Sequence, residues 1–166
     1  MNTHKFFFRR SFTIILAAVL MFVLSACSTE NSRKTESYVT SVKTLVNDSV
    51  NNTRTLRTQY DEFNCKENES SNAYISTLET LSDLYGQLIK LESPDDYDDL
   101  DEQIKSNANE VLSIITELKT LVKYAVENAD DSLYQKDKEE LLNNYYEYYN
   151  TLTSLSSEVQ TRFRNA

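Results

Sequence analysis

Few residues of this sequence could take part in chemistry. The only histidine is His4, near the start of the chain, and the only cysteines are Cys27 and Cys65. Carboxylates are more plentiful, and seven of them fall within the eleven residues from Glu92 to Glu102. A thiol could act as a nucleophile or as an attachment point, and clustered carboxylates could bind a hard cation such as calcium. The surroundings of these residues decide between such roles.

Cys27 follows a segment that is typical of an export signal. Lys5, Arg9 and Arg10 give a positive start, and residues 12–24 form an apolar stretch of thirteen residues without charge. As a helix this stretch would reach only about 20 Å, whereas the hydrocarbon core of a bilayer is roughly 30 Å thick. The stretch is therefore too short for a comfortable permanent membrane span.

The four residues Leu24, Ser25, Ala26 and Cys27 resemble the lipobox of bacterial lipoproteins. In that family the cysteine thiol receives a diacylglyceryl group, and the signal is cut just before it. The resemblance implies that residues 1–26 are a lipoprotein signal peptide and that Cys27 is lipidated. Two or three acyl chains would anchor the protein stably, since each buried CH₂ contributes about 0.8 kcal/mol. An ordinary signal peptide, or a short membrane helix with an incidental cysteine, is the alternative.

Cleavage before Cys27 would leave 140 residues, enough for one domain with a real core. Residues 1–26 hold three basic and no acidic residues, so Lys plus Arg falls from 17 to 14 against 26 Asp plus Glu, a net charge of about −12. Such a surface repels nucleic acid, and no nucleic-acid partner is predicted. The cleaved chain would also lack histidine, which excludes His-based triads and His-ligated metals within it.

With Cys27 lipidated, Cys65 would be the only free thiol, so no disulfide could form within the chain. Cys65 is interpreted as a small, half-buried apolar residue, with an intermolecular disulfide as the alternative. No Gly-rich phosphate loop and no nucleophile in a recognisable motif occurs. The sequence therefore predicts no enzyme, no catalytic residue, no cofactor and no metal ligand. An acid and base pair of carboxylates remains the only conceivable enzymatic route.

Residues 27–37 are interpreted as the lipidated cysteine and a polar tether, and residues 38–166 as the folded domain. The ten residues from Ser28 to Ser37 show no periodicity and would reach at most about 35 Å if extended. The whole chain holds one glycine and one proline, which is unusual for sheet proteins with their tight turns. The domain is therefore predicted to be all-helical.

The first two helices are predicted over residues 38–63 and 72–91, with residues 64–71 as a loop. The first is the less convincing, because residues 47–55 are polar or β-branched and have poor helix propensity. The second has five apolar or aromatic residues at spacings of 4 and 3, namely Tyr74, Leu78, Leu81, Tyr85 and Leu88. Gly86 beside this seam is either a tolerated loss of about 1 kcal/mol or a point of close helix contact.

A third helix is predicted from Pro94 to Asn128. Ser93 is placed to cap it, Pro94 suits a first helical position, and acidic residues follow at the positive helix end. The acidic run therefore fits a solvated helix start, with a cation site as the alternative; an EF-hand loop would need alternating ligands and a central glycine. The seam is almost entirely apolar: Tyr97, Leu100, Ile104, Asn107, Val111, Ile114, Leu118, Leu121 and Ala125. Asn107 either sets the register or turns aside so that Ala108 packs, and the second is favoured.

A fourth helix is predicted from the caps at residues 130–132 to Arg162. Its seam is Tyr134, Leu141, Tyr145, Tyr148, Leu152, Leu155 and Val159. Four tyrosines fall within residues 145–149, and at 100° per residue they cannot all face one core. At least one ring must therefore lie at the rim, where tyrosine either packs with its hydroxyl in water or forms a recognition face. The candidate partner face is Tyr145, Tyr146 and Tyr149.

These patterns predict an all-α, antiparallel four-helix bundle after a cleaved signal helix, with a three-helix bundle and a frayed first helix as the alternative. The chain resembles the small helical lipoproteins of bacterial envelopes. This resemblance implies a lipid anchor on the extracytoplasmic side of the bacterial membrane, or of an outer membrane where the host has one. The predicted function is non-enzymatic binding or scaffolding of a protein partner. The alternative is a lipoprotein that binds a small ligand or a cation.

Overall fold

The computed structural model describes the backbone of residues 4–166 and the side chains of residues 30–166. In this part of the chain it shows four α-helices, one short 3₁₀ turn and no strand: α1 (His4–Glu62), α2 (Asn68–Ile89), η1 (Asp95–Tyr97), α3 (Asp98–Asn128) and α4 (Ser132–Asn165). Residues Tyr38–Ala166 form one compact unit, and Met1–Ser37 are a separate one. The prediction of an all-α four-helix bundle is confirmed.

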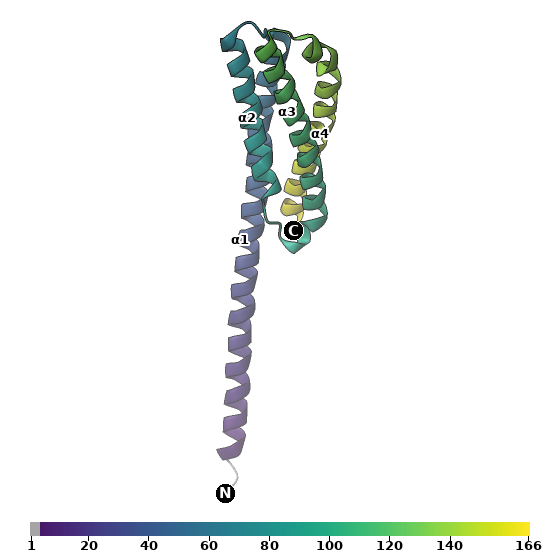
Figure 1. The fold of residues 1–166 in the computed structure, drawn as a ribbon. Helices are drawn as coiled ribbons and strands as arrows, with labels where there is room; N and C mark the ends of the chain where they lie inside the picture. The colour runs from purple at the N-terminus through teal and green to yellow at the C-terminus, as the bar shows by residue number, and fades with distance from the viewer. Residues whose placement is uncertain (1–3) are drawn as a thin grey trace. The chain divides into compact units, whose positions relative to one another are not determined.

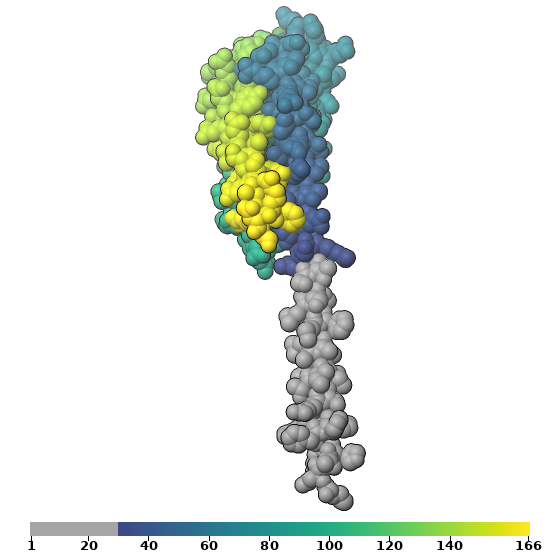
Figure 2. All heavy atoms as spheres, turned by 180° about the vertical axis from the view of Figure 1, so that it is seen from behind, coloured from purple at the N-terminus to yellow at the C-terminus, as the bar shows by residue number. Residues whose placement is uncertain are grey.

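Short connections arrange the helices of the compact unit as antiparallel neighbours. The links are residues 63–67, 90–94 and 129–131, too short to cross the bundle. Helix α3 packs against both α2 and α4, as the ribbon shows (Figure 1). Seen from behind, α1 lies along α4 (Figure 2), and α1 and α4 share a hydrogen bond between Thr53 and Tyr145. The two helices farthest apart in sequence therefore meet across the bundle.

The core is one continuous cluster of buried side chains from all four helices. On α3 the predicted seam is buried almost throughout, and Ile115 and Val122, which are also buried, widen it. Ala108 is fully buried, whereas the Asn107 amide turns back and donates from Nδ2 to the Gln103 carbonyl at 2.8 Å. The interpretation that Asn107 turns aside and leaves Ala108 to pack is confirmed.

Residues 30–37 are helical, so the irregular tether predicted there is wrong in its conformation. The Lys34 ammonium lies 3.5 Å from the Glu30 carboxylate, and Thr35 Oγ1 donates to the Asn31 carbonyl at 3.0 Å. The ion pair joins side chains one helical turn apart, a spacing that adds a few tenths of a kcal/mol to a helix. A helix advances about 1.5 Å per residue, so this segment reaches less than half as far as an extended chain.

Helix α2 begins at Asn68, four residues before the predicted start at Asn72. The loop is shorter because Asn64 closes it: its side-chain Oδ1 accepts from the Lys66 N–H at 3.1 Å, and its carbonyl accepts from the Glu67 N–H at 3.0 Å. Ser71, expected in the loop, is a buried helical residue whose hydroxyl donates to the same Asn64 carbonyl. Asparagine favours such turns because its side chain bonds the backbone two residues on.

The predicted cap at the start of the third helix is wrong in its detail. Ser93 makes no cap bond; its Oγ donates to Asp98 Oδ1 at 2.6 Å. Pro94 precedes the 3₁₀ turn, and its carbonyl accepts from the Tyr97 N–H at 2.8 Å before α3 begins at Asp98. The backbone of Pro94 is extended, with a ψ of 150°, so Pro94 lies outside the helix, which starts four residues later than predicted.

Helix α3 ends at a left-handed residue, Ala129, with a φ of 51°. The N–H groups of Ala129 and Asp130 then bond back to the last turn, which satisfies two carbonyls of the helix end. The Asp130 carboxylate accepts from the Ser132 N–H at 2.9 Å, which lowers the pKa of Asp130 and fixes the start of α4. The reversal between α3 and α4 therefore needs no glycine.

Candidate functional site

The predicted lipidation site, Cys27, and the predicted signal peptide, residues 1–26, lie outside the residues whose side chains the structure describes. The lipid anchor therefore stays a prediction. In the described part of the chain, no helix carries an apolar stretch that is long enough to cross a membrane.

Tyr145 does not belong to a surface, so its assignment to a partner face is wrong. Its side chain is fully buried in the middle of the bundle. Its hydroxyl shares a hydrogen bond of 2.6 Å with Thr53 of α1 and one of 3.2 Å with Tyr85 of α2. Burial raises the pKa of Tyr145 well above its ordinary value, since an ionised phenol would lose its hydration there. Tyr145 therefore joins three helices through one hydroxyl.

The other two members of the predicted face, Tyr146 and Tyr149, are half-buried and pack on the core. The rings of Tyr145 and Tyr149 are stacked with their centroids 6.0 Å apart, and the Tyr146 ring meets the Tyr145 ring edge-on at 5.6 Å. Such pairs hold the outer rings in fixed orientations. What remains of the predicted face is therefore a rigid aromatic pair with partly exposed rings.

Arg57 of α1 lies beside this pair. Burial raises the pKa of Tyr146, and the nearby Arg57 guanidinium partly offsets this rise. The same guanidinium lies 5.6 Å from the centre of the Tyr60 ring and 3.5 Å from the Asp61 carboxylate. We call Arg57, Tyr146 and Tyr149 the α1–α4 face. It combines two aromatic rings with one exposed cation, and no local sequence pattern indicates that Arg57 lies beside these tyrosines.

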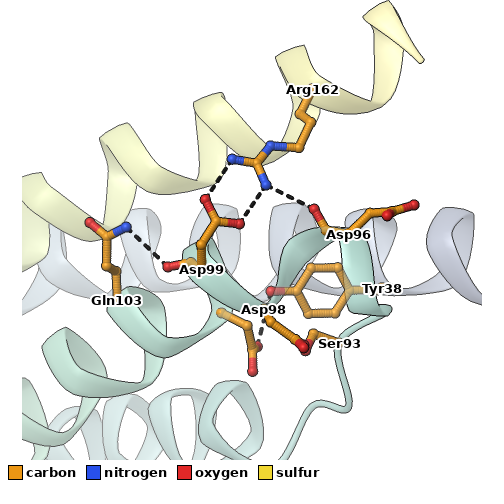
Figure 3. Close-up of polar contacts among 8 residues, drawn as sticks. Tyr38, Ser93, Asp96, Asp98, Asp99, Gln103 and Arg162 are labelled. Atoms are coloured by element: carbon orange, nitrogen blue, oxygen red, sulfur yellow. Dashed lines mark hydrogen bonds and ion pairs between the residues drawn. The ribbon is translucent and has the colours of Figure 1, made fainter.

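The acidic segment at the start of α3 has partners within the protein. The Arg162 guanidinium of α4 donates two hydrogen bonds to the Asp99 carboxylate, of 2.5 Å and 2.8 Å (Figure 3). It donates a third to the Asp96 carbonyl at 2.8 Å. The guanidinium also lies 5.6 Å from the centre of the Tyr97 ring. The bonds from Arg162 hold the pKa of Asp99 below its usual range. Because 63 residues separate this pair, no local pattern could reveal it.

A second carboxylate of the segment, Asp101, is buried. It accepts a hydrogen bond from the Tyr38 hydroxyl at 3.0 Å and pairs with Lys105 at 2.7 Å. Burial, followed by the nearby Asp101 charge, raises the pKa of Tyr38. Among the described residues, no group of three or more His, Cys, Asp or Glu side chains is arranged to hold a metal ion. The segment thus fastens α1 and α4 to the start of α3.

Another aromatic cluster lies at the other end of the bundle from the acidic segment, where α4 begins. The Tyr134 hydroxyl lies 3.2 Å from the Tyr60 carbonyl and 3.3 Å from the Tyr74 hydroxyl, and the Phe63 and Tyr134 rings are 4.6 Å apart. Burial raises the pKa of Tyr74 to about 12. Lys138 caps the cluster, with its ammonium 4.8 Å from the centre of the Tyr60 ring.

Cys65 lies in the loop between α1 and α2 and is a free thiol, 8% exposed. Its prediction as a small apolar residue is confirmed, with more complete burial than expected, because the loop folds over the end of the core. The exposed thiol that an intermolecular disulfide would need is not present in this conformation.

No protein-family model matches this chain, and no match to it was found among curated proteins or among solved structures.

Proposed function

We propose that this protein is a lipid-anchored protein of the bacterial cell envelope with a non-enzymatic binding or scaffolding role. The lipobox of Leu24, Ser25, Ala26 and Cys27, at the end of a short export signal, is the observation that carries the proposal. The anchor would hold the bundle on the extracytoplasmic side of the membrane. Ser28 follows the cysteine, and a residue other than Asp there usually goes with outer-membrane sorting in hosts that have an outer membrane.

The α1–α4 face supports a binding role. Tyrosine and arginine are enriched at the centres of protein interfaces, since they offer a large contact area and directional hydrogen bonds. Tyr146 and Tyr149 are already held by packing on Tyr145, so little rotamer freedom would be lost on binding. A protein partner that presents a carboxylate beside an apolar surface would match this face. Its affinity would come from the aromatic pair and its orientation from Arg57.

The anchor is tested by replacing Cys27 with serine in the native host. We expect lipid labelling to disappear and the chain to leave the membrane fraction, or to stay as an unprocessed precursor. Cys65→Ser is the matched control and should keep both the label and the membrane location. A processed Cys27→Ser chain that stays fully membrane-bound would refute the anchor.

The binding role is tested by crosslinking in cells followed by a pull-down of the anchored protein. Tyr146→Ala should weaken partner capture, and Tyr124→Ala is the matched control, because Tyr124 is an exposed tyrosine on α3, 42% exposed. Since Tyr146 is half-buried, its truncation should lower the free energy of unfolding by about 1 to 2 kcal/mol, more than an ordinary surface change. Arg57→Ala removes an exposed side chain and serves as a second, less disruptive variant. Unchanged capture by both Tyr146→Ala and Arg57→Ala would exclude this face.

A further inference from the structure

One segment of α1 contributes almost nothing apolar to the core. Val46 and Leu56 are both buried, but in residues 47–55 between them the only buried side chains are Ser49 and Thr53. The other members of this stretch are exposed or half-buried. Two and a half turns of helix therefore lack the apolar burial that stabilises helices in proteins.

The same nine residues are weak helix formers. Asparagine, serine, threonine, aspartate and valine all rank low, and residues 47–55 contain only these apart from Arg54. Several side chains bond back to carbonyls of the preceding turn: Ser49 Oγ donates to Val46 at 2.7 Å, and Asn52 Nδ2 donates to Asp48 at 2.9 Å. Such bonds compete with the helix and tend to bend it. Neither packing nor propensity holds this segment strongly.

The flanks of the segment are held much better. Before it, Val39, Val42 and Val46 are buried, and after it Leu56 and Tyr60 are buried. The segment itself has a direct hydrogen bond to α4, between Thr53 and Tyr145, and the Ser49 and Thr53 hydroxyls also lie beside the Tyr85 hydroxyl of α2. If that bond breaks, the Tyr145 hydroxyl keeps its second partner, Tyr85. Opening would therefore leave no buried phenol without a partner, which limits its free-energy cost.

We propose that residues 47–55 are a joint within α1: they open as a local unit while α2, α3 and α4 stay folded. The opening interrupts the helix between residues 38–46 and residues 56–62, both of which stay packed on the core. Proteins open in such local units wherever few apolar contacts hold the backbone. This inference does not depend on the lipid anchor.

Native-state hydrogen exchange on the full chain in detergent tests the joint. We expect amides of residues 47–55 to be at least roughly tenfold less protected than those of residues 100–122 in α3, and their exchange to depend little on low concentrations of urea. Flanking amides of residues 38–46 and 56–62 should be better protected than those of the joint. Equal protection across all of α1 would overturn the proposal, because α1 would then open as a whole or only with global unfolding.

Two matched pairs of variants distinguish local from global opening. Asn51→Ala with Thr55→Ala improves helix propensity at exposed positions of the joint, and Asn109→Ala with Thr116→Ala makes the same changes at exposed positions of α3. Thr55 and Thr116 both donate to the carbonyl four residues earlier, and the α3 pair also removes the bond from Asn109 Nδ2 to the Lys105 carbonyl. The first pair should slow exchange in residues 47–55 roughly fivefold to tenfold. The second pair should leave it unchanged, and slowing of the joint by the α3 pair would overturn the proposal.

Discussion

Helices α3 and α1 are parts of one bundle but are held in it by different means. Helix α3 buries an aliphatic face, on which Asp101 is the only buried charged or polar residue, and its single tyrosine, Tyr124, is exposed. From Tyr38 onward, α1 buries valines, two tyrosines and the small hydroxyl residues Ser49 and Thr53. Aliphatic packing is non-directional, whereas each buried hydroxyl needs a partner in one place.

The difference shows what each helix contributes. Around α3, burial of apolar area supplies most of the free energy of folding. Around α1, three sets of hydroxyl contacts fix the register of α1: Tyr38 with Asp101, Thr53 with Tyr145, and the Tyr60 carbonyl with Tyr134. A shift of α1 by one turn would break all three and leave buried polar groups unpaired, at about 1 to 3 kcal/mol each. Stability and specificity are thus divided between two faces of the same core.

Alkaline unfolding gives the largest test of this division. Burial raises the pKa of seven core tyrosines above the ordinary value near 10: Tyr38, Tyr60, Tyr74, Tyr85, Tyr97, Tyr134 and Tyr145. A raised pKa in the folded state means that stability is complete below pH 10 and is lost as the pH rises toward the folded values. Each group removes at most about 1.4 kcal/mol per pH unit, so several groups together match a typical stability of ~5 to 15 kcal/mol within about two units.

Tyrosinate absorbance and circular dichroism followed together over this pH range check the prediction. We expect one cooperative transition in which the buried tyrosines ionise as the helices melt. Gradual ionisation of all eleven tyrosines near pH 10, with the helices intact, would show that the hydroxyl contacts of α1 do not control access to the core.

Truncation of the aliphatic face comes next in size. Leu118 is fully buried on α3, and Leu118→Ala should lower the free energy of unfolding by about 3 to 5 kcal/mol, through lost transfer energy and a cavity. Leu121→Ala, at a half-buried position of the same helix, is the control and should have a clearly smaller effect. Urea unfolding measures both. Equal effects would mean that the inner face of α3 is not the main source of stability.

The sequence predicted the α3 side of the bundle well, because apolar residues at spacings of 3 and 4 leave only one buried face. On the α1 side it predicted the helix over residues 38–63 but not the buried hydroxyl contacts that hold this helix. The buried positions of Ser49 and Thr53 look like a polar interruption until Tyr145, 92 residues away from Thr53, supplies a partner. The ion pair between Arg162 and Asp99 was missed for the same reason, since two residues far apart in sequence leave no local pattern when they pair.

The tyrosine cluster of α4 shows what helical periodicity can and cannot predict about burial. Helical geometry required that the four rings could not all be buried, and three of them are indeed half-buried. The predicted seam placed Tyr145 in the core, which is correct, but it also placed Tyr148 there, and the candidate partner face wrongly included Tyr145. The order of burial among these tyrosines depends on Thr53 and Tyr85, which meet Tyr145 only in the folded bundle.

Removing the Tyr145 hydroxyl tests whether hydrogen bonds from hydroxyl groups hold α1 in place. Tyr145→Phe keeps the ring but leaves Thr53 without its partner on α4, so it should destabilise the bundle by about 1 to 3 kcal/mol. Tyr146→Phe is the control and should have little effect, since its half-buried phenol is more accessible to water. Adding Thr53→Val to Tyr145→Phe should recover part of the loss, because two apolar groups can replace a hydrogen-bonded pair almost neutrally. A double-mutant cycle in urea measures this coupling, and a value of zero would remove Thr53 from the contacts that fix α1.

The smallest expected effect on stability comes from Gly86 of α2, because a substitution there changes helix propensity without changing packing. Gly86 is not in a left-handed conformation, and a Cβ built on it would meet no atom within 4 Å. The close helix contact considered for this glycine is therefore absent. Gly86→Ala should stabilise the protein by up to about 1 kcal/mol, through helix propensity alone. Thermal unfolding of Gly86→Ala beside the wild type checks this.

Since α2 already buries Tyr85 and Leu88 on either side, the gain should appear as global stability and leave exchange in residues 47–55 unchanged. If exchange there slowed as well, opening of the joint would involve α2, and the contrast between α1 and the rest of the bundle would have to be redrawn.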